Sequence, residues 1–85
     1  MNTAPMTPDR IAEMIRAGLP GATVQVESDD NTHFGARIVA TQFAGLRPIA
    51  RHQLVYKTLG ALVGREIHAL SIEALTPEEI AAKRL

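Results

Sequence analysis

The segment from residue 34 to residue 75 limits the fold most, because a helical pattern lies there between two strand patterns. Residues 34–41 alternate between apolar and other positions, as do residues 67–75, which is typical of half-buried strands. Residues 51–64 carry apolar side chains at helical spacing. Because a strand–helix–strand connection favours a right-handed crossover, this segment predicts two parallel strands with a helix packed on their sheet.

The chain before this segment predicts a helix and a third strand. Thr7-Pro8-Asp9 provides a hydroxyl N-cap, a proline at the first helical position and an acid in the first turn, so a helix is expected over 8–17. Gly18 follows as its end. Residues 22–27 alternate like a half-buried strand, and the turn Asp29-Asp30-Asn31 joins them to the next strand as a hairpin.

The remaining segments complete the predicted order. Residues 46–50 contain Pro48 and are expected to be irregular or a single helical turn. The helix over 51–64 places Val55, Leu59, Leu62 and Val63 on one stripe, with Gly64 as its C-cap. Thr76-Pro77-Glu78-Glu79 is a capping box that begins a last short helix. The sequence thus predicts an α+β fold, helix–strand–strand–helix–strand–helix, with a three-stranded mixed sheet and helices on one face.

Composition limits the classes of function. Eighty-five residues allow one domain, expected over 7–85 after a flexible N-terminus at 1–6. Nine basic and nine acidic residues give no net charge to attract nucleic acid or an anionic membrane. No cysteine is present, so the chain alone cannot form a cysteine-ligated metal centre. Because no apolar run approaches the roughly 20 residues of a membrane span, we expect a cytoplasmic protein.

Three histidines are the candidates for a site. His68 opens the last predicted strand directly after a turn, where the sheet can fix a side chain that still reaches solvent. The alternative for His68 is a histidine that packs an edge and bonds a carbonyl. His33 lies at the start of the second strand, where it is either a ligand or a solvated loop residue. His52 lies at the edge of the apolar stripe and is interpreted as structural.

Enzymatic chemistry and nucleic-acid binding receive less support from the residues. Ser71 has no histidine at an identifiable partner spacing, and the sequence contains no phosphate-binding glycine loop, so we expect a non-enzymatic protein. Residues 46–64 resemble a helix-turn-helix in outline, and a DNA-binding role would use the nearby basic residues Arg47, Arg51, Lys57 and Arg65. Arg51 has the alternative of lying along the core with its guanidinium capping carbonyls.

Several of these segments together resemble the BolA family of small regulatory proteins. The matching positions are Thr32-His33-Phe34, Phe43 and Gly45, Arg51-His52 with Val55-Tyr56 and Leu59, Ile67-His68-Ala69-Leu70, and Thr76-Pro77-Glu78-Glu79. They span about 24–79 in the order typical of the family. The sequence differs at Ile80, where the family usually has tryptophan, and at Gln53, where a basic residue is common.

The resemblance implies a class II KH-like fold and a monothiol glutaredoxin as partner. It also implies a [2Fe–2S] cluster shared with that glutaredoxin and glutathione, with none bound by the isolated chain. The family's ligand histidine corresponds to His68, and a second ligand from the loop between the first two strands corresponds to His33. Imidazoles on one iron and thiolates on the other would resemble a Rieske-type centre. DNA remains the alternative partner, and the sequence does not decide whether the free protein forms a homodimer.

Overall fold

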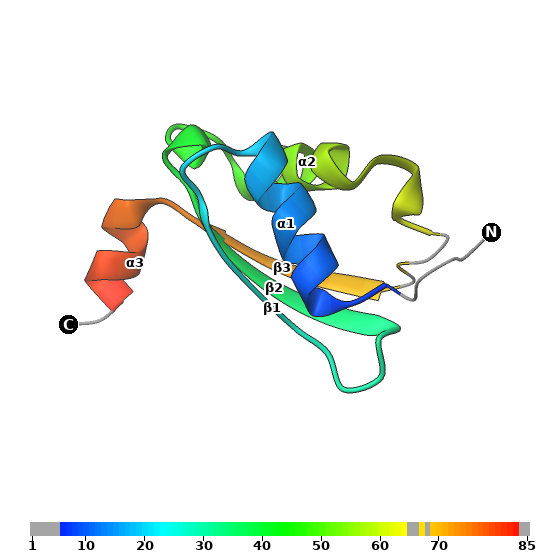
Figure 1. The fold of residues 1–85 in the computed structure, drawn as a ribbon. Helices are drawn as coiled ribbons and strands as arrows, with labels where there is room; N and C mark the ends of the chain where they lie inside the picture. The colour runs from blue at the N-terminus through cyan, green and yellow to red at the C-terminus, as the bar shows by residue number, and fades with distance from the viewer. Residues whose placement is uncertain (1–5, 65–66, 68, 84–85) are drawn as a thin grey trace.

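A computed structural model describes residues 6–64, 67 and 69–83 of the chain. Its helices and strands follow the order α1 (Pro8–Gly18), β1 (Thr23–Glu27), β2 (His33–Val39), α2 (Pro48–Leu59), β3 (Ala69–Leu75) and α3 (Pro77–Lys83) (Figure 1). Two short 3-10 helices, η1 (Thr41–Phe43) and η2 (Gly60–Leu62), precede and follow α2. The predicted α+β fold and its element order are confirmed.

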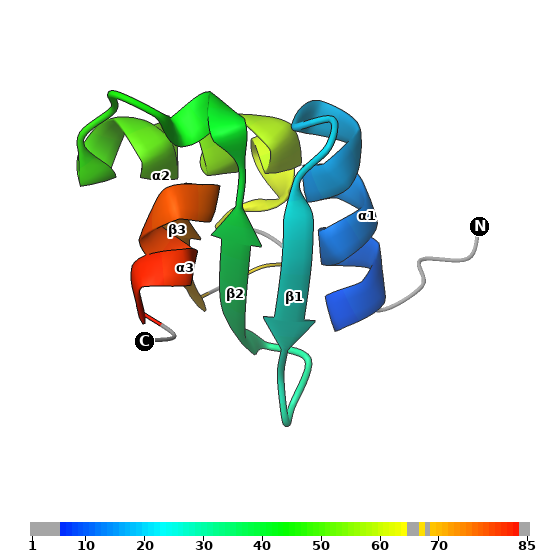
Figure 2. The ribbon, with the colours of Figure 1, turned by 90° about the vertical axis from the view of Figure 1, so that its left-hand side faces the viewer.

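The three strands form one mixed sheet with β2 in the centre (Figure 2). β1 pairs with β2 antiparallel, and Val24 lies opposite Ile38. β2 pairs with β3 in parallel, and Phe34 lies opposite Leu70. The strand–helix–strand segment therefore forms the parallel crossover that its pattern predicts.

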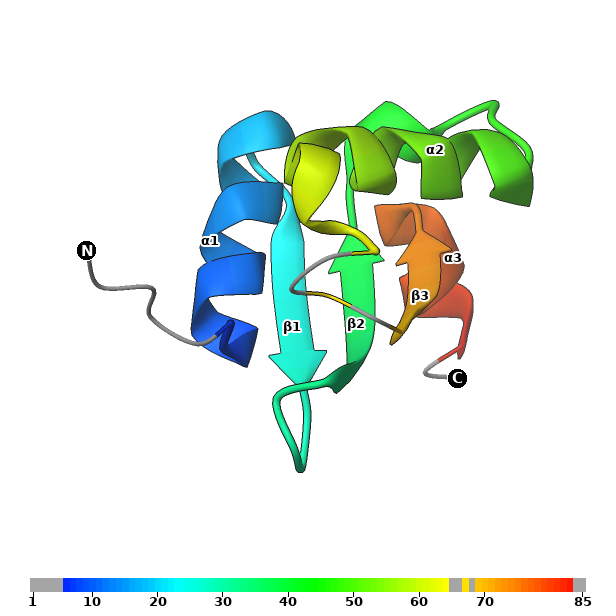
Figure 3. The same ribbon diagram turned by 90° about the vertical axis from the view of Figure 1, so that its right-hand side faces the viewer.

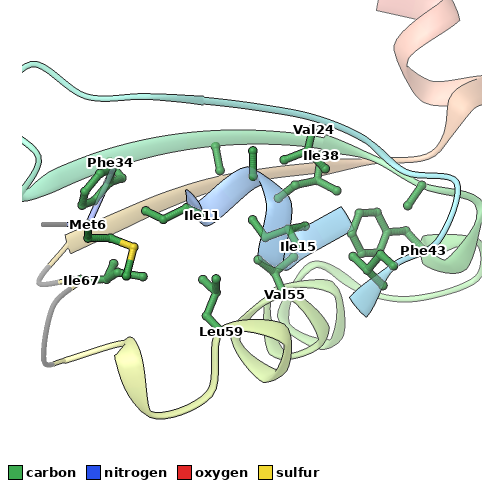
Figure 4. Close-up of a cluster of buried hydrophobic side chains, with 14 residues drawn as sticks. Met6, Ile11, Ile15, Val24, Phe34, Ile38, Phe43, Val55, Leu59 and Ile67 are labelled. Carbon is green, nitrogen blue, oxygen red and sulfur yellow. The ribbon is translucent and has the colours of Figure 1, made fainter. Parts of the chain in front are cut away.

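Helices α1 and α2 cover one face of the sheet, and the hydrophobic core lies between these two layers (Figures 1 and 3). The alternating positions of β1 and β2 supply Val24, Phe34, Ala36 and Ile38 to the core. Figure 4 shows Val24, Phe34 and Ile38 packed with residues from both helices and from η1, namely Ile11, Ile15, Phe43, Val55 and Leu59.

Met6 also belongs to this core, which differs from the expectation for the N-terminal segment. Its side chain is 4% exposed and lies beside Phe34 and Ile67 (Figure 4). The sequence shows only one apolar residue just before the N-cap Thr7, too little to predict burial. A hydrophobic residue at that position commonly packs against the helix that follows, and Met6 shows the same tendency.

Helix α3 does not lie with the other two helices. It follows β3 at the end of the sheet (Figure 2), and its Lys83 contacts Glu73 at 2.7 Å. Glu73 lies opposite Arg37 in the strand pairing, on the face that α1 and α2 leave uncovered. The predicted packing of helices on one face therefore holds for α1 and α2, whereas α3 contacts the other face.

Helix α2 begins earlier and ends earlier than the sequence predicts. Residues 46–50 were expected to be irregular or a single helical turn, and from Pro48 they are the first turn of α2, because proline is tolerated at a helix start. The helix ends at Leu59, and Gly60, with φ of 58°, takes the C-cap position that was predicted for Gly64. The stripe prediction holds for Val55 and Leu59, whereas Val63 is exposed.

The predicted third strand also begins later than expected. β3 starts at Ala69, whereas Ile67 forms an isolated bridge with Val63 and is buried in the core. No helix in the described ranges is long and apolar enough to cross a membrane.

Candidate metal-ligand site at the β1–β2 loop

The loop between β1 and β2 is built by hydrogen bonds from short polar side chains. Ser28 Oγ accepts from the backbone N–H of Asn31 at 2.9 Å and donates to the carbonyl of His33 at 2.6 Å. Asp30 Oδ1 accepts from the backbone N–H groups of Thr32 and His33, both at 2.9 Å. Asn31 adopts φ of 55°, a conformation that asparagine tolerates in tight turns. These bonds fix the start of β2, where His33 stands.

His33 is an exposed imidazole held in one orientation by Asp30. Its side chain is 71% exposed, and its Nδ1 lies 2.9 Å from Asp30 Oδ2. The backbone and then the side chain of His33 donate hydrogen bonds that lower the pKa of Asp30 well below its usual range. Because an ionised carboxylate only accepts hydrogen bonds, Nδ1 is the donor in this contact, which leaves Nε2 as the ring nitrogen that can bind a metal.

The space beside His33 is a hollow of about 360 Å³ on the uncovered face of the sheet. It is lined by β1, the loop, β2 and β3, through Glu27, Ser28, Asp29, His33, Phe34, Gly35 and Ser71. Gly35 places no side chain on this face and leaves open space there. The imidazole therefore borders an open surface that a second molecule can approach.

His68, the other predicted ligand, lies outside the described residues. Its two sequence neighbours are described: Ile67 is buried in the core, and Ala69 is the exposed first residue of β3. Ala69 is also the residue of β3 that pairs with His33 of β2. The parallel pairing therefore brings the residue next to His68 in the sequence beside the other candidate ligand.

The third histidine, His52, is not part of this group. It is half-buried on α2, which packs on the opposite face of the sheet from the hollow beside His33. In the described part of the chain, no three His, Cys, Asp or Glu side chains are grouped so that they could hold a metal ion. A metal bound at His33 would therefore need ligands beyond those of the described residues.

Arg51, a predicted nucleic-acid contact, is instead a structural residue. Its side chain is 11% exposed, and its guanidinium forms a double contact with the Glu79 carboxylate, at 2.6 and 3.2 Å. It also donates to the carbonyls of Leu46 at 2.9 Å and Ala74 at 3.0 Å. The alternative in which the guanidinium caps carbonyls is therefore the arrangement observed, and little of it is left for a phosphate.

The other described residues of the predicted nucleic-acid set, Arg47 and Lys57, lie at the two ends of α2. Arg47 is the exposed N-cap residue of α2, and Lys57 is exposed in its last turn. Arg47 and Lys57 are ten positions apart, which corresponds to about 15 Å along the helix axis. Arg65 lies outside the described residues. Residues 46–64 contain one α-helix followed by a 3-10 turn, so the expected helix-turn-helix outline is not present.

Sequence reasoning missed the partners of two residues in these contacts. The sequence predicts only a turn at Asp30, although its spacing of three positions from His33 allows an aspartate to reach both the backbone and the ring. For Glu79 the sequence predicts only the capping box, which the structure has, with Thr76 N and Glu79 Oε1 2.8 Å apart. Its second role, the contact with Arg51, joins residues 28 positions apart and leaves no local signal.

Comparison with known proteins gives a consistent match. The family model described as BolA-like protein matches residues 17–79. A protein of Acinetobacter guillouiae, named as an uncharacterised protein in the rpoN-murA intergenic region, is 40% identical over 75 residues. That alignment covers 87% of this chain and 89% of the relative.

A second relative carries a functional name. The DNA-binding transcriptional regulator BolA of Vibrio cholerae is 44% identical over 54 residues, which are 64% of this chain and 51% of the relative. Among solved structures, that of a BolA protein homologue from Coxiella burnetii has a TM-score of 0.79 and 37% identity. It covers 88% of this chain and 96% of the homologue.

Proposed function

Because the chain belongs to the BolA-like family, we propose that it is a non-enzymatic adaptor that binds a monothiol glutaredoxin and shares a [2Fe–2S] cluster with it. The observation that carries this proposal is the exposed imidazole of His33, oriented by Asp30 and paired through β2 with the residue next to His68. His33 and His68 are the proposed ligands from this chain.

The donor set supports a shared cluster rather than one held by this chain. Iron–sulfur clusters are usually held by thiolates, and this chain has no cysteine. It offers imidazole nitrogens, which replace two cysteines on one iron in Rieske centres and raise the reduction potential. The thiolates would come from glutaredoxin and glutathione, and the cluster would supply one-electron chemistry or a group for transfer.

The Asp30–His33 contact supports the role of His33 as a ligand. Metal-binding histidines commonly donate their other ring N–H to a carboxylate, which fixes the tautomer and orients the ring. Asp30 Oδ2 is placed to accept such a bond, because His33 Nδ1 lies 2.9 Å away. The cost of ordering the side chain on binding is therefore reduced.

Co-expression of this chain with a monothiol glutaredoxin tests the proposal, because a cluster-bridged heterodimer would be coloured. We expect His68→Ala and His33→Ala to change its visible spectrum, and Asp30→Asn to change it less. His52→Ala is the matched control, because it removes a histidine from α2, and its spectrum should equal that of the unmodified complex. A colourless complex, or a spectrum equally altered in all three histidine variants, would count against the proposal.

A DNA-binding regulator is the second candidate function, favoured by the printed name of the Vibrio cholerae relative. Of the predicted set, Arg47 and Lys57 are exposed, Arg51 is paired with Glu79, and Arg65 lies outside the described residues. Phosphate contacts make affinity fall with rising salt. Arg47→Gln and Lys57→Gln should each remove one phosphate contact. Each should therefore reduce the magnitude of the slope of log affinity against log salt concentration by about 1. Absence of binding even at low salt would exclude this role.

A further inference from the structure

The outward side of α2 carries apolar residues that the fold leaves in water. We call this surface the outer ridge and define it as Ile49, Gln53, Tyr56 and Lys57. At 100° per residue these positions lie within about 100° of one another around the helix. Ile49 is 69% exposed and Tyr56 is 39% exposed. They are two of the three large hydrophobic residues that are exposed in the described part of the chain.

The contrast with α1 shows that this ridge is unusual for the molecule. α1 is amphipathic: Ile11, Ala12 and Ile15 are buried, and charged residues occupy its outer side. α2 buries Val55 and Leu59 on the core side and leaves Ile49 and Tyr56 exposed, about 60–80° around the helix from Leu59. The apolar part of α2 is therefore wider than the stripe that the core covers. No other described element lies over the outer side of α2 (Figure 3).

The charges around the ridge are basic. Residues 40–64, which include α2 and the segments beside it, contain three Arg and Lys side chains and no Asp or Glu. Arg51 is paired with Glu79, whereas Arg47 and Lys57 are exposed on α2. The ridge therefore combines apolar side chains with nearby positive charge, although the whole chain has no formal net charge.

We propose that the outer ridge docks an acidic amphipathic helix of a partner protein. Ile49 and Tyr56 are seven positions apart, about 10 Å along the axis, so a partner helix of two to three turns can pack its apolar side chains along them. Carboxylates of the partner helix, next to its apolar side chains, would then lie near Lys57 and Arg47. This inference is independent of the proposed cluster site, because it uses a different face of the molecule.

Two other occupants fit the ridge less well. DNA requires several cations, and the most exposed large hydrophobic side chain here is that of Ile49, which gains nothing from a phosphate. A second copy of this chain would need free carboxylates beside apolar residues. Three of its carboxylates, those of Asp30, Glu73 and Glu79, are engaged with His33, Arg37, Lys83 and Arg51 of the same molecule, which leaves fewer carboxylates for such a contact.

Titration of the isotope-labelled full chain, followed by amide NMR, tests the proposal. The probe is a synthetic amphipathic helix of leucine and glutamate, and the control probe replaces each glutamate with lysine. We expect the acidic peptide to shift the amide signals of residues 49–57, and the basic peptide to leave them in place. Ile49→Ser and Lys57→Glu should each weaken binding about tenfold, a loss of about 1.4 kcal/mol. Both residues are exposed, so both variants should fold.

Glu13→Gln provides the matched control, because it changes one exposed charge on α1 and should leave the affinity unchanged. Shifts confined to other surfaces, or equal binding of both peptides, would overturn the proposal. So would a double-stranded DNA oligonucleotide that binds the ridge more tightly than the acidic peptide at physiological salt. Sedimentation at rising protein concentration covers the remaining case: dimers that Ile49→Ser dissociates would assign the ridge to a second copy instead.

Discussion

One guanidinium, that of Arg51, joins three parts of the fold. It bonds the segment before α2 through Leu46, the end of β3 through Ala74, and α3 through Glu79. Glu79 in turn accepts from the backbone N–H of Thr76, so the same carboxylate caps α3 and anchors it. None of the residues of α3 is fully buried, so this anchor is a main attachment of that helix.

The contact with Arg51, and then the Thr76 backbone, lower the pKa of Glu79 from 4.5 to about 2. A carboxylate whose pKa is depressed by folding stabilises the folded state above its unfolded pKa, and this stabilisation is lost as pH falls through the folded value. We therefore expect the free energy of unfolding to decrease between about pH 5 and pH 2.

Glu79→Gln should make that decrease shallower, because the variant has no carboxylate to protonate at this position. It should also lower the thermal midpoint at neutral pH, where the charged contact is lost. Chemical denaturation of both proteins across this pH range is the measurement. Identical pH profiles would show that the Arg51–Glu79 contact contributes nothing to acid sensitivity. Glu78→Gln, on the neighbouring exposed position of α3, is the control and should keep the original profile.

At the scale of the elements, α1 and α2 approach each other closely at one glycine. A Cβ added to Gly18 would lie 2.9 Å from Thr58 Cβ and closer still to its Cγ2. Thr58 is held in place, since its hydroxyl donates to the carbonyl of Val55 at 2.6 Å. Gly18 is therefore the last residue of α1, and its lack of a side chain allows α2 to pack closely against α1.

We expect Gly18→Ala to destabilise the fold. Overpacking typically costs about 1–3 kcal/mol, which outweighs the gain of up to about 1 kcal/mol from replacing glycine in a helix. Thr58→Ser removes Cγ2, the closer atom, and retains both Cβ and the hydroxyl, so in that background Gly18→Ala should cost less. A double-mutant cycle by urea denaturation measures this coupling. Additive effects of the two substitutions would show that the contact between these side chains is not the cause.

The sequence predicts an element well where its apolar residues recur at a regular spacing. It predicts less well the features that depend on a single contact, such as the end of a helix. Val24, Phe34, Ala36 and Ile38 alternate, so their burial and the face that they share follow from the pattern. The end of α2 depends on Gly60 and not on Gly64, and both glycines have positive φ, so residue type alone could not choose between them. Similarly, the exposure of His33 follows from its place after a turn, whereas its contact with Asp30 depends on side-chain geometry.

At the scale of the whole molecule, the three-stranded sheet has two edge strands, β1 and β3. Exposed edge strands can pair with another chain, and natural proteins commonly block them with charged side chains. Arg16 of α1 donates to the carbonyl of Val24 on β1 at 3.0 Å, and Arg51 of α2 donates to the carbonyl of Ala74 on β3 at 3.0 Å. α1 and α2 thus each place one arginine side chain against the backbone of an edge strand.

This arrangement predicts that Arg16 limits self-association through β1. Arg16→Gln shortens the side chain and removes its charge, so the Val24 carbonyl should become available to a strand of another molecule. We expect a higher sedimentation coefficient at high protein concentration for this variant than for the unmodified chain. Glu13→Gln, on the same helix, changes one charge without touching β1 and should sediment like the unmodified chain. If Arg16→Gln sediments like the unmodified chain at every concentration, then the packing of α1 beside β1, rather than the guanidinium, is what keeps the edge from pairing.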